Sequence, residues 1–404
     1  MKVRYLFLIT FLILLFTNDA KASEIPRLGG WNYDWMIQVK DKLDTGDQTF
    51  QPAYQKLIAD AETALKKGVY SVTFKKMVPP SGSKNDYMSM GPYWWPDPEK
   101  SDGLPYIRRD GEVNPERDNL DRPQVGGLVN DVRTLTLAWF FSGQSEYAEK
   151  AAGLLRVWFL DPETLMNPHL KYGQSIPGRT EGRGIGIIDT RAFHVLVDAI
   201  SVLETSNKLS GDELEDIRTW FGDYFTWLTE SQFGKDEEEH PNNHSVAFDA
   251  QASGIAYFIG NDEYVARKAR EIPQRRIDPM IESDGRQPAE LSRTRAHSYS
   301  VSNLRNFFDA GEIGLKAGVD IFNYENPDEG SLPKALDYLI DYIDREEDWP
   351  YEQISDWTQS ENNLGLLIHR AAGIYDNEEY KTLWEELFFE RVKTHWSLLV
   401  TQGM

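Results

Sequence analysis

The chain of 404 residues is 40% hydrophobic, 12% aromatic and 27% charged. This composition is typical of a globular protein and excludes wholesale disorder, collagen-like repeats and a multi-span membrane architecture. Its formal net charge of -22 argues against non-specific nucleic-acid binding, and the absence of cysteine excludes disulfides, thiolate metal sites and cysteine nucleophiles.

The first 22 residues have the pattern of a secretory signal peptide. Lys2 and Arg4 precede an apolar run at residues 6–16, and the segment ends with AKA at 20–22. A membrane anchor is the alternative, but a spanning helix needs about 20 apolar residues. We therefore expect a signal peptide at 1–22 and one domain at 23–404, which is free of the membrane in the periplasm or outside the cell.

After residue 22, the chain shows helical periodicity and no long alternating strand pattern. Apolar residues recur at helical spacing at residues 132–140, 147–158, 193–203, 214–228 and 336–343. The first of these helices is expected to end near Gly143. No Ser/Gly linker, low-complexity tract or change in composition divides residues 23–404.

Consecutive helices joined by short turns predict helical hairpins that pack in series. Because no strict sequence repeat accompanies them, a closed ring fits better than an open solenoid with polar caps. The expected fold is all-α: an (α/α) toroid, or incomplete barrel of helical hairpins. Binding residues are expected in the stretches that interrupt this pattern, because loops on a rigid scaffold often carry function.

The first interruption covers residues 71–114 and contains the motif YWWPDP at 93–98. Its Tyr93, Trp94 and Trp95 stand in a polar, proline-rich loop, where helix core is not expected. Aromatic faces beside hydrogen-bonding groups suit a sugar ring, which offers both C–H faces and hydroxyls. The alternative is a loop that folds onto its own aromatic side chains.

The second interruption is YGQSIPGRTEGRGIG at 172–186. No strand is expected before its glycines, so a dinucleotide-binding fingerprint is not supported. A glycine-rich turn could let backbone and arginine side chains approach an anionic ligand. A plain connector into a helix near Asp189 is the favoured alternative.

The third interruption consists of two segments, NNHS at 242–245 and residues 284–299. Between residues 265 and 305 there are nine basic and five acidic residues, in a chain that is otherwise strongly acidic. Such an island of positive charge points to an anionic ligand. Helix faces on which these residues pair with neighbouring acids are the alternative, which charge alone slightly favours.

Metal and serine-nucleophile sites are not expected. His240 and His244 have a spacing that can place both on one helical face, but Pro241 lies between them and the HExxH pattern is missing. No GxSxG motif occurs either. We therefore expect neither a bound metal nor a cofactor.

Five segments in this order resemble the alginate-lyase family of helical-toroid polysaccharide lyases. They are PSG at 80–82 through DY at 86–87, YWWPDP at 93–98, GRGIGIIDTR at 182–191, NNHS at 242–245 and RTRAHSY at 293–299. Together they span most of the chain after the signal peptide. The sequence is most similar to polysaccharide lyase family thirty-eight, whose activity covers glucuronan and alginate.

The resemblance implies β-elimination of a 1,4-linked polyuronide, an anionic polysaccharide, without a cofactor. Such an enzyme neutralises the C6 carboxylate, removes the C5 proton and protonates the leaving O4. Asn243 can hydrogen-bond the carboxylate, and His244 can support the developing enolate. Tyr299 can act as base and then as acid if neighbouring arginine and histidine lower its pKa from about 10.

The family also implies further site residues. Arg293 is the fourth catalytic candidate, but this chain has one residue fewer between that arginine and the tyrosine than the better-known alginate lyases. Whether Arg293 or Arg295 contacts the carboxylate is therefore open. The residues expected to contact substrate are Tyr93, Trp94, Trp95, Gln174, Arg191, Arg295 and His297. Apart from the family, Tyr299 fits a half-buried helix aromatic and His244 a hydrogen bond at a helix start.

Two other functions compete with the lyase. A glycoside hydrolase on a similar toroid would use two carboxylates, for which Asp86 and Asp97 are candidates. A non-catalytic periplasmic polyuronide-binding protein would bind the polymer without turnover. In the lyase, mannuronate or glucuronate is expected over guluronate, because only in the first two do the C5 proton and O4 share one side of the ring. The oligomeric state is left open.

Overall fold

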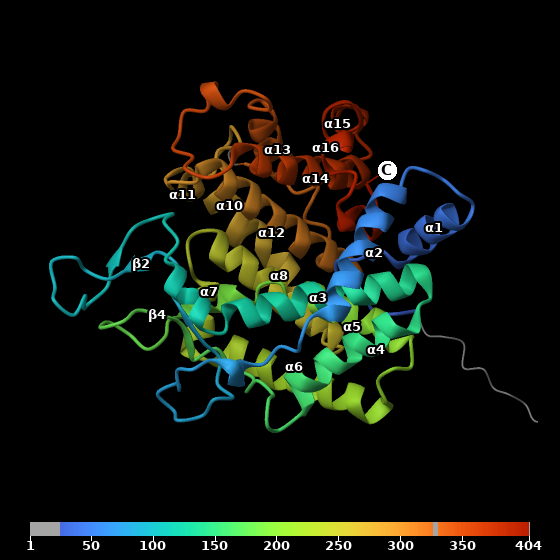
Figure 1. The fold of residues 1–404 in the computed structure, drawn as a ribbon. Coiled ribbons are helices and arrows are strands. Elements are labelled where there is room, and N and C mark those ends of the chain that lie inside the picture. Colours follow the sequence, from blue (N-terminus) through green and yellow to red (C-terminus); the bar gives the residue numbers. More distant parts are fainter. Residues whose placement is uncertain (1–24, 326–329, 404) are drawn as a thin grey trace, which may run out of the picture.

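The computed structural model describes residues 25–325 and 330–403. The expected signal peptide lies outside the described residues. Helices account for most of the described chain, and the strands are two to four residues long. The helices pack into an all-α toroid, with the short strands in loops that project from one end (Figure 1).

The helices of the first half form the lower and right-hand part of the ring in Figure 1. They are α1 (Tyr33–Asp44), α2 (Gln51–Lys66), α3 (Arg122–Ser142), α4 (Ser145–Leu155), α5 (Phe193–Glu204), α6 (Gly211–Glu230) and α7 (Gln232–Glu238). Those of the second half are α8 (Asn243–Phe258), α9 (Asp262–Ile272), α10 (Asp278–Met280), α11 (Pro288–Leu291), α12 (Ala296–Lys316), α13 (Leu332–Ile340), α14 (Trp357–Tyr375), α15 (Glu378–Leu383) and α16 (Phe389–Val392).

Local sequence signals explain where several helices begin and end. Helix α3 ends where expected, because Gly143 adopts a left-handed conformation with φ of 72° and its N–H binds the Trp139 carbonyl. Helix α6 begins with a capping box formed by Ser210 and Glu213. The last predicted helix, α13, ends at Ile340, so Ile343 lies in the following turn and the expected end is wrong by one helical turn.

The expected helix at 147–158 is only partly regular. Helix α4 ends at Leu155, and residues Arg156–Leu160 continue it as a single π-helical turn. Trp158 and Phe159 are nevertheless buried on this turn. The apolar pattern therefore predicts the buried face correctly, although the backbone widens at its end.

Four short strands hold the loop stretches. Strand β1 (Met88–Met90) pairs in parallel with β4 (Tyr172–Ser175), and β2 (Trp94–Trp95) pairs antiparallel with β3 (Ile107–Arg108). The prediction that no strand precedes the glycines of 178–186 is therefore wrong, because β4 opens that stretch. It belongs to a two-stranded pair, and the segment after it, Gly184–Thr190, is a 3-10 turn that leads into α5.

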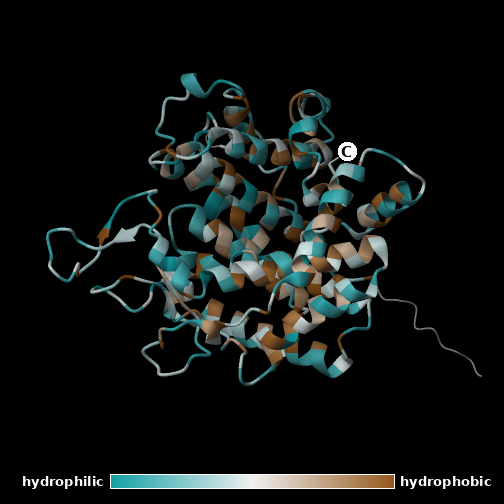
Figure 2. Ribbon diagram, viewed as in Figure 1, coloured by the Kyte–Doolittle hydropathy of each residue, from teal (hydrophilic) through white to brown (hydrophobic). Residues whose placement is uncertain are grey.

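The core has two parts that meet at α8 and α12. One part is built mainly from α1 to α6, and the other from α12 to α16. Helix α8 contributes Phe248 and Ile255 to the first part and Val246 and Ala250 to the second. Figure 2 shows hydrophobic residues along the packed helices, whereas the projecting loops are mostly hydrophilic.

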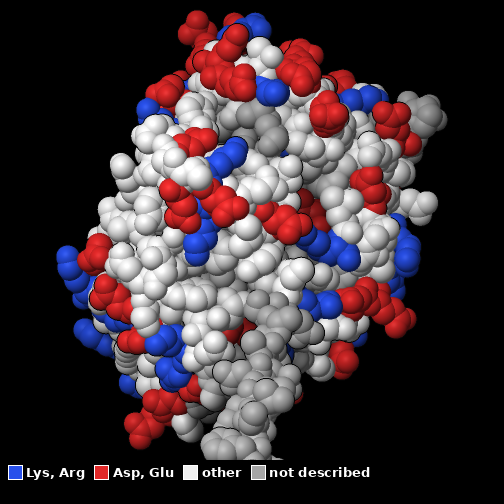
Figure 3. All heavy atoms as spheres, turned by 90° about the vertical axis from the view of Figure 1, so that its right-hand side faces the viewer, with Lys and Arg blue, Asp and Glu red and all other residues white. Residues whose placement is uncertain are grey.

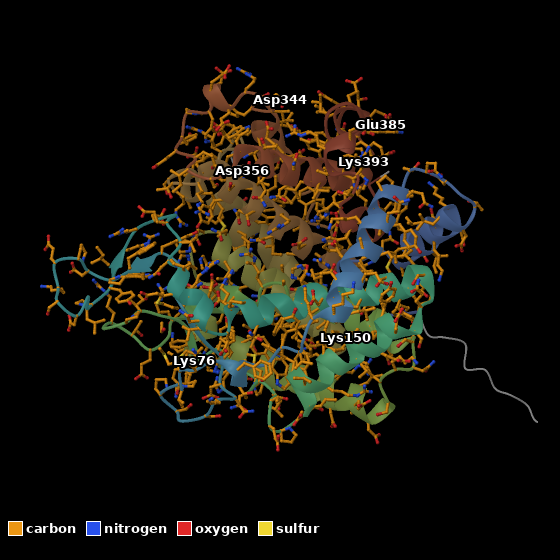
Figure 4. All side chains as sticks on the ribbon, in the orientation of Figure 1. Lys76, Lys150, Asp344, Asp356, Glu385 and Lys393 are labelled. Carbon is orange, nitrogen blue, oxygen red and sulfur yellow. The ribbon has the colours of Figure 1, made fainter. Side chains whose placement is uncertain are left out.

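The outer surface carries charge on nearly every element. Figure 4 labels Lys76, Asp356 and Glu385, which are exposed and lie at the periphery of the helices. In residues 25–325 and 330–403, no helix combines the length and the hydrophobicity needed to cross a membrane.

Candidate active site

The three loop stretches converge at the end of the toroid where α8 and α12 begin. There Tyr93, next to β2, meets Tyr299 on α12, and Asp110, after β3, meets Arg293 just before α12. On the neighbouring helix, Asn243 at the start of α8 binds Glu290 of α11. The β2–β3 hairpin and the β4 segment project from this end at the left of Figure 1.

The hydroxyl of Tyr299 is the centre of this arrangement. It lies 2.8 Å from the Tyr93 hydroxyl, and the Arg293 guanidinium donates a hydrogen bond to it at 3.0 Å. The same guanidinium stacks on the Tyr299 ring, 4.1 Å from its centroid. A phenolate at Tyr299 could therefore accept hydrogen bonds from both neighbours.

In the free protein, the pKa of Tyr299 is raised above its ordinary value of about 10. Burial is the main cause and Tyr93 acts in the same direction, whereas the charge of Arg293 acts to lower the pKa. The expectation that neighbouring cations lower this pKa below 10 is thus not met, because burial outweighs the arginine.

The two arginines of the RTRAHSY segment point to different partners. Arg293 forms an ion pair with Asp110 at 2.9 Å and reaches Tyr299. Arg295 instead donates to the backbone carbonyl of Gly111, and its buried Nε has no hydrogen-bond partner among the residues that the structure describes. Arg293 is therefore the arginine at the tyrosine, and Arg295 ties the hairpin to the start of α12.

Asn243 is held by a buried carboxylate that sequence reasoning did not find. Glu290 accepts from the Asn243 backbone N–H at 2.7 Å and from its side-chain amide at 2.8 Å. Both residues are almost completely buried, and burial raises the pKa of Glu290. One amide hydrogen of Asn243 stays available, and its direction is set by the other.

We expect Glu290→Ala to destabilise the protein by about 3 kcal/mol, because two buried donors of Asn243 lose their acceptor and each costs about 1–3 kcal/mol. Urea unfolding measures this change. Glu282→Ala is the matched control, since its side chain is 47% exposed and pairs with the exposed Arg286. A loss no larger than that of the control would contradict the assigned role of Glu290.

His244 is oriented in the same way by Glu237 of α7. Its Nδ1 lies 2.7 Å from the Glu237 carboxylate, which is fully buried. A carboxylate at Nδ1 favours a proton on that nitrogen and leaves Nε2 as the atom that can face a ligand. Burial raises the pKa of Glu237, and His244 opposes that rise.

The aromatic side chains of β2 are half-buried, and arginines cover part of their surface. Trp94 lies 5.2 Å from Arg179 and 5.9 Å from Arg183. Trp95 donates from its indole nitrogen to the Glu112 carbonyl at 3.0 Å. Tyr93 reaches Tyr299 directly, whereas the two tryptophans contact these neighbours and stay partly exposed.

Gln174, on strand β4, is buried next to the candidate site. It donates to Asp189 at 3.2 Å and accepts from Arg183 at 3.1 Å, and its backbone has a positive φ of 46°. Asp189 also accepts hydrogen bonds from Tyr87, Ser89 and Arg122. Gln174 is therefore not exposed as a substrate-contacting residue would be. Its side-chain amide is bonded to Asp189 and Arg183 instead.

His297 does not face the site. Its side chain is fully buried in the second part of the core, against Trp349 and Trp357, and its Nδ1 lies 2.7 Å from the Ser360 hydroxyl. The expectation that His297 contacts substrate is therefore wrong. His297 stands two residues before Tyr299 on α12, so its side chain points to another side of the helix, into the core.

Burial lowers the pKa of His297 to about 4, below the value of about 6.5 in an unfolded chain. The unfolded state then binds more protons between these values, so this histidine stabilises the fold fully above pH 6.5 and loses that effect as the pH falls toward 4. We expect the free energy of unfolding to fall less between pH 7 and pH 5 in His297→Gln than in the wild type. Ser360→Ala, which keeps the histidine, is the control, and equal pH slopes in all three proteins would contradict the assignment.

Most of the basic residues between 265 and 286 are paired with acids. Arg276 binds the buried Asp249 at 2.8 Å, and Lys268 pairs with Glu238 at 2.5 Å. Arg267, Arg275 and Arg286 also form ion pairs with acidic neighbours. For these five residues the interpretation as paired helix faces is confirmed.

The carboxylates considered for a hydrolase already accept hydrogen bonds from other groups of the protein. Asp86 accepts hydrogen bonds from Ser81 and Asn167, and Asp97 accepts one from the Glu99 backbone. Among the residues that the structure describes, no group of three or more His, Asp or Glu side chains could hold a metal ion.

Sequence reasoning found the loop residues but missed the charged residues that contact them or their partners. These are Asp110, Arg122, Asp189, Glu237 and Glu290, and each makes a contact at the site described above. Glu290 lies inside the segment that the analysis singled out, yet nothing in its spacing shows that it meets Asn243.

Comparisons with known proteins agree over most of the chain. The family described as alginate lyase matches residues 71–349. A crystal structure of an alginate lyase from Bacteroides ovatus is 39% identical, covers 93% of this chain and 99% of its own, and superimposes with a TM-score of 0.90. This agreement confirms the predicted all-α toroid.

Two more distant structures share the fold. A variant of alginate lyase A1-III in complex with a tetrasaccharide is 15% identical, covers 85% of this chain and 88% of its own, and has a TM-score of 0.58. Alginate lyase A1-III from Sphingomonas species A1 is 16% identical, covers 83% and 86%, and has a TM-score of 0.56. A comparison with curated protein sequences finds no significant match. The family match and the similarity to the Bacteroides ovatus enzyme show that this chain belongs to the alginate lyase family and is a polysaccharide lyase.

Proposed function

We propose that the protein cleaves β-1,4-linked polyuronides, glucuronan or the mannuronate blocks of alginate, by β-elimination. The observation that carries this proposal is the Tyr299 hydroxyl, held at 3.0 Å by Arg293 and at 2.8 Å by Tyr93. It lies on α12, beside the start of α8 that presents Asn243 and His244. This arrangement puts a proton-transfer group next to donors for a carboxylate.

In this proposal Asn243 and His244 bind the C6 carboxylate and stabilise the enolate that forms when C5 loses its proton. Glu290 and Glu237 fix these two side chains before substrate arrives. Donors that are already oriented need no reorganisation during the reaction. The buried carboxylates are thus positioning residues, because they act through Asn243 and His244.

Tyr299 takes the proton from C5 as a phenolate and returns a proton to O4 as the C4–O4 bond breaks. The electron pair of the C5–H bond forms the C4–C5 double bond, and the leaving O4 becomes a hydroxyl. One tyrosine can do both because C5–H and O4 lie on the same side of mannuronate and glucuronate. Since its pKa is raised in the free protein, the rate should rise with pH through the alkaline range.

Purified protein is to be incubated separately with polymannuronate, polyguluronate and glucuronan while the absorbance of unsaturated uronate is followed. We expect a rise with glucuronan or polymannuronate that is larger than with polyguluronate. New reducing ends without that absorbance would support a hydrolase instead. Polymer binding without either product would support a binding protein.

The signal peptide expected at residues 1–22 supports the further proposal that the enzyme acts on these polymers after its export from the cytoplasm. Fractionation of expressing cells tests this, since a processed chain starting after Ala22 is expected in the exported fraction. An unprocessed chain in the cytoplasmic fraction would contradict export.

A further inference from the structure

A cavity of about 360 Å³ lies in the middle of the toroid, under the candidate site. Its walls come from α3, α5, α8, α12 and α14, together with residues 30–31 and 395–401. Asn306 lines it and also donates to the Asn243 carbonyl at 3.3 Å, so its upper end adjoins the residues described above. The mechanism proposed for Tyr299 makes no use of this space.

The cavity has an excess of unpaired positive charge. Among the residues that the structure describes, no protein group forms an ion pair or hydrogen bond with the guanidinium of Arg191 or Arg305, both of which line it. Arg133, a third lining arginine, stacks on Trp396 at 4.2 Å, and its Nε is buried without a partner. Two or three guanidinium groups therefore face the same small volume.

The acidic residues of the cavity form their direct ion pairs and hydrogen bonds with other groups. Asp309 and Glu312 both bind Arg370, at 2.9 and 2.8 Å. Asp198 accepts three backbone N–H groups from residues 29–31, at 2.7 to 2.9 Å. The charge of Arg305 helps to lower the pKa of Asp309, although the two side chains form no direct ion pair in the part of the chain that the structure describes.

The titration of neighbouring groups agrees with this picture. The pKa of Arg191 is lowered to about 10 by burial and then by the charges of Arg305 and Arg122. The pKa of His395, which also lines the cavity, is lowered to about 4 by burial and then by Arg133 and Arg305. Burial alone gives both directions and the neighbouring arginines add to it. His194, which lines the same cavity, instead has a raised pKa, because Asp309 and Asp198 act against its burial.

The rest of the lining suits a sugar. Trp31 and Trp396 lie with ring centroids 6.2 Å apart, and Ala247, Ala250 and Leu367 add apolar wall. Asn306 and Asn363 offer amides for hydroxyl groups. A pyranose presents both apolar C–H faces and hydroxyls, and arginine forks match a carboxylate.

We propose that this central cavity is a second binding site, which takes one hexuronate residue with its carboxylate between Arg191 and Arg305. The identity of the sugar rests on the proposed function, whereas the anionic character of the ligand rests on the arginines. The hexuronate is either the end of a polymer bound at the candidate site or a free monosaccharide.

A smaller cavity next to the central one would let a free sugar reach it from the surface. It measures about 220 Å³ and shares Gly30, Trp31, Glu312 and Thr401 with the central cavity. It lies toward the face that carries α1 and the C-terminal end, where Figure 3 shows acidic and basic side chains intermixed. A polymer end would instead enter past Asn306, from the side of Tyr299.

Titration of the whole protein with sodium D-glucuronate, followed by calorimetry, tests the site. We expect saturable binding to the wild type, no binding of D-glucose, and at least a tenfold weaker affinity for glucuronate in Arg305→Gln. Arg345→Gln is the matched control, because Arg345 is exposed and pairs with Asp348 at 2.7 Å. Arg305→Lys, which keeps the charge, should fall between wild type and Arg305→Gln. Absence of saturable binding, or equal affinity in wild type and Arg305→Gln proteins of matching circular dichroism, overturns the proposal.

The source of the hexuronate is decided in the Tyr299→Phe background, where polymer is not consumed. If a polymer end fills the cavity, a glucuronate tetramer competes with glucuronate and binds more weakly after Arg305→Gln. If a free monosaccharide fills it, tetramer and glucuronate bind together and only the second depends on Arg305. Glucuronate binding at Arg305 in a protein that forms no unsaturated product would refute the proposed function and leave the anion site standing.

Discussion

Replacing Tyr299 by phenylalanine should lower the turnover of polyuronide by about 10³-fold, which is within the range lost when a general acid–base group is removed. The ring, its stacking with Arg293 and the packing of α12 are kept, and only the hydroxyl is lost. Substrate affinity should change little, because the hydroxyl acts in the proton transfers of the reaction and not in holding the substrate. The initial rate of absorbance increase and the polymer affinity of the variant measure these two effects.

Tyr106→Phe is the matched control for this experiment. Its hydroxyl binds Glu116 at 2.7 Å in the projecting loop, away from Arg293 and Tyr299. We expect its turnover to stay within about twofold of the wild type, as surface substitutions remote from special features change little. If Tyr299→Phe kept wild-type turnover, the assignment of Tyr299 as base and acid would be wrong, and the rest of the proposed mechanism with it.

The second large effect should separate Arg293 from Arg295, which the sequence leaves open. Arg293→Met removes the guanidinium that donates to Tyr299 at 3.0 Å, so we expect turnover to fall by about 10²–10³-fold, as when one preorganised donor is lost. Arg295→Met removes a hydrogen bond to the Gly111 carbonyl. It should cost about 1–3 kcal/mol of stability, because a buried acceptor loses its donor, and should change turnover far less.

The pair of variants is its own control, since both replace an arginine of the same segment by a side chain of similar length. Turnover is measured by unsaturated product at saturating polymer, and stability by urea unfolding. The opposite order, with Arg295→Met the slower enzyme and Arg293→Met the less stable protein, would transfer the catalytic role from Arg293 to Arg295.

The helices show how far a local pattern reaches. The apolar faces at 193–203 and 214–228 become α5 and α6 almost to the residue, and Gly143 ends α3. Helical periodicity reports which side of a segment is buried, and this depends only on residues three and four positions apart. At Arg156–Leu160 and after Ile340 the backbone departs from a regular helix while the apolar side stays buried, so ends were predicted less well than faces.

The candidate site divides in the same way. Asn243, His244, Arg293 and Tyr299 are recognised from two short motifs, and the structure brings their segments to one end of the toroid. Glu290 and Glu237 are not recognised, because nothing local distinguishes them from other acids in a chain with 65 of them. His297 shows the converse error, since a motif marks it as much as Tyr299 although its side chain points into the core.

By itself, the sequence determined the helical class, the succession of helices, the family and the segments that carry the chemistry. These follow from periodicity and from motifs, which are properties of residues near one another in the chain. Only the tertiary structure decided that Tyr93 meets Tyr299 across 206 residues, that Arg293 and not Arg295 reaches it, and that Arg191 and Arg305 line one cavity. These contacts arise from closure of the ring, which juxtaposes helix ends and leaves no trace in local spacing.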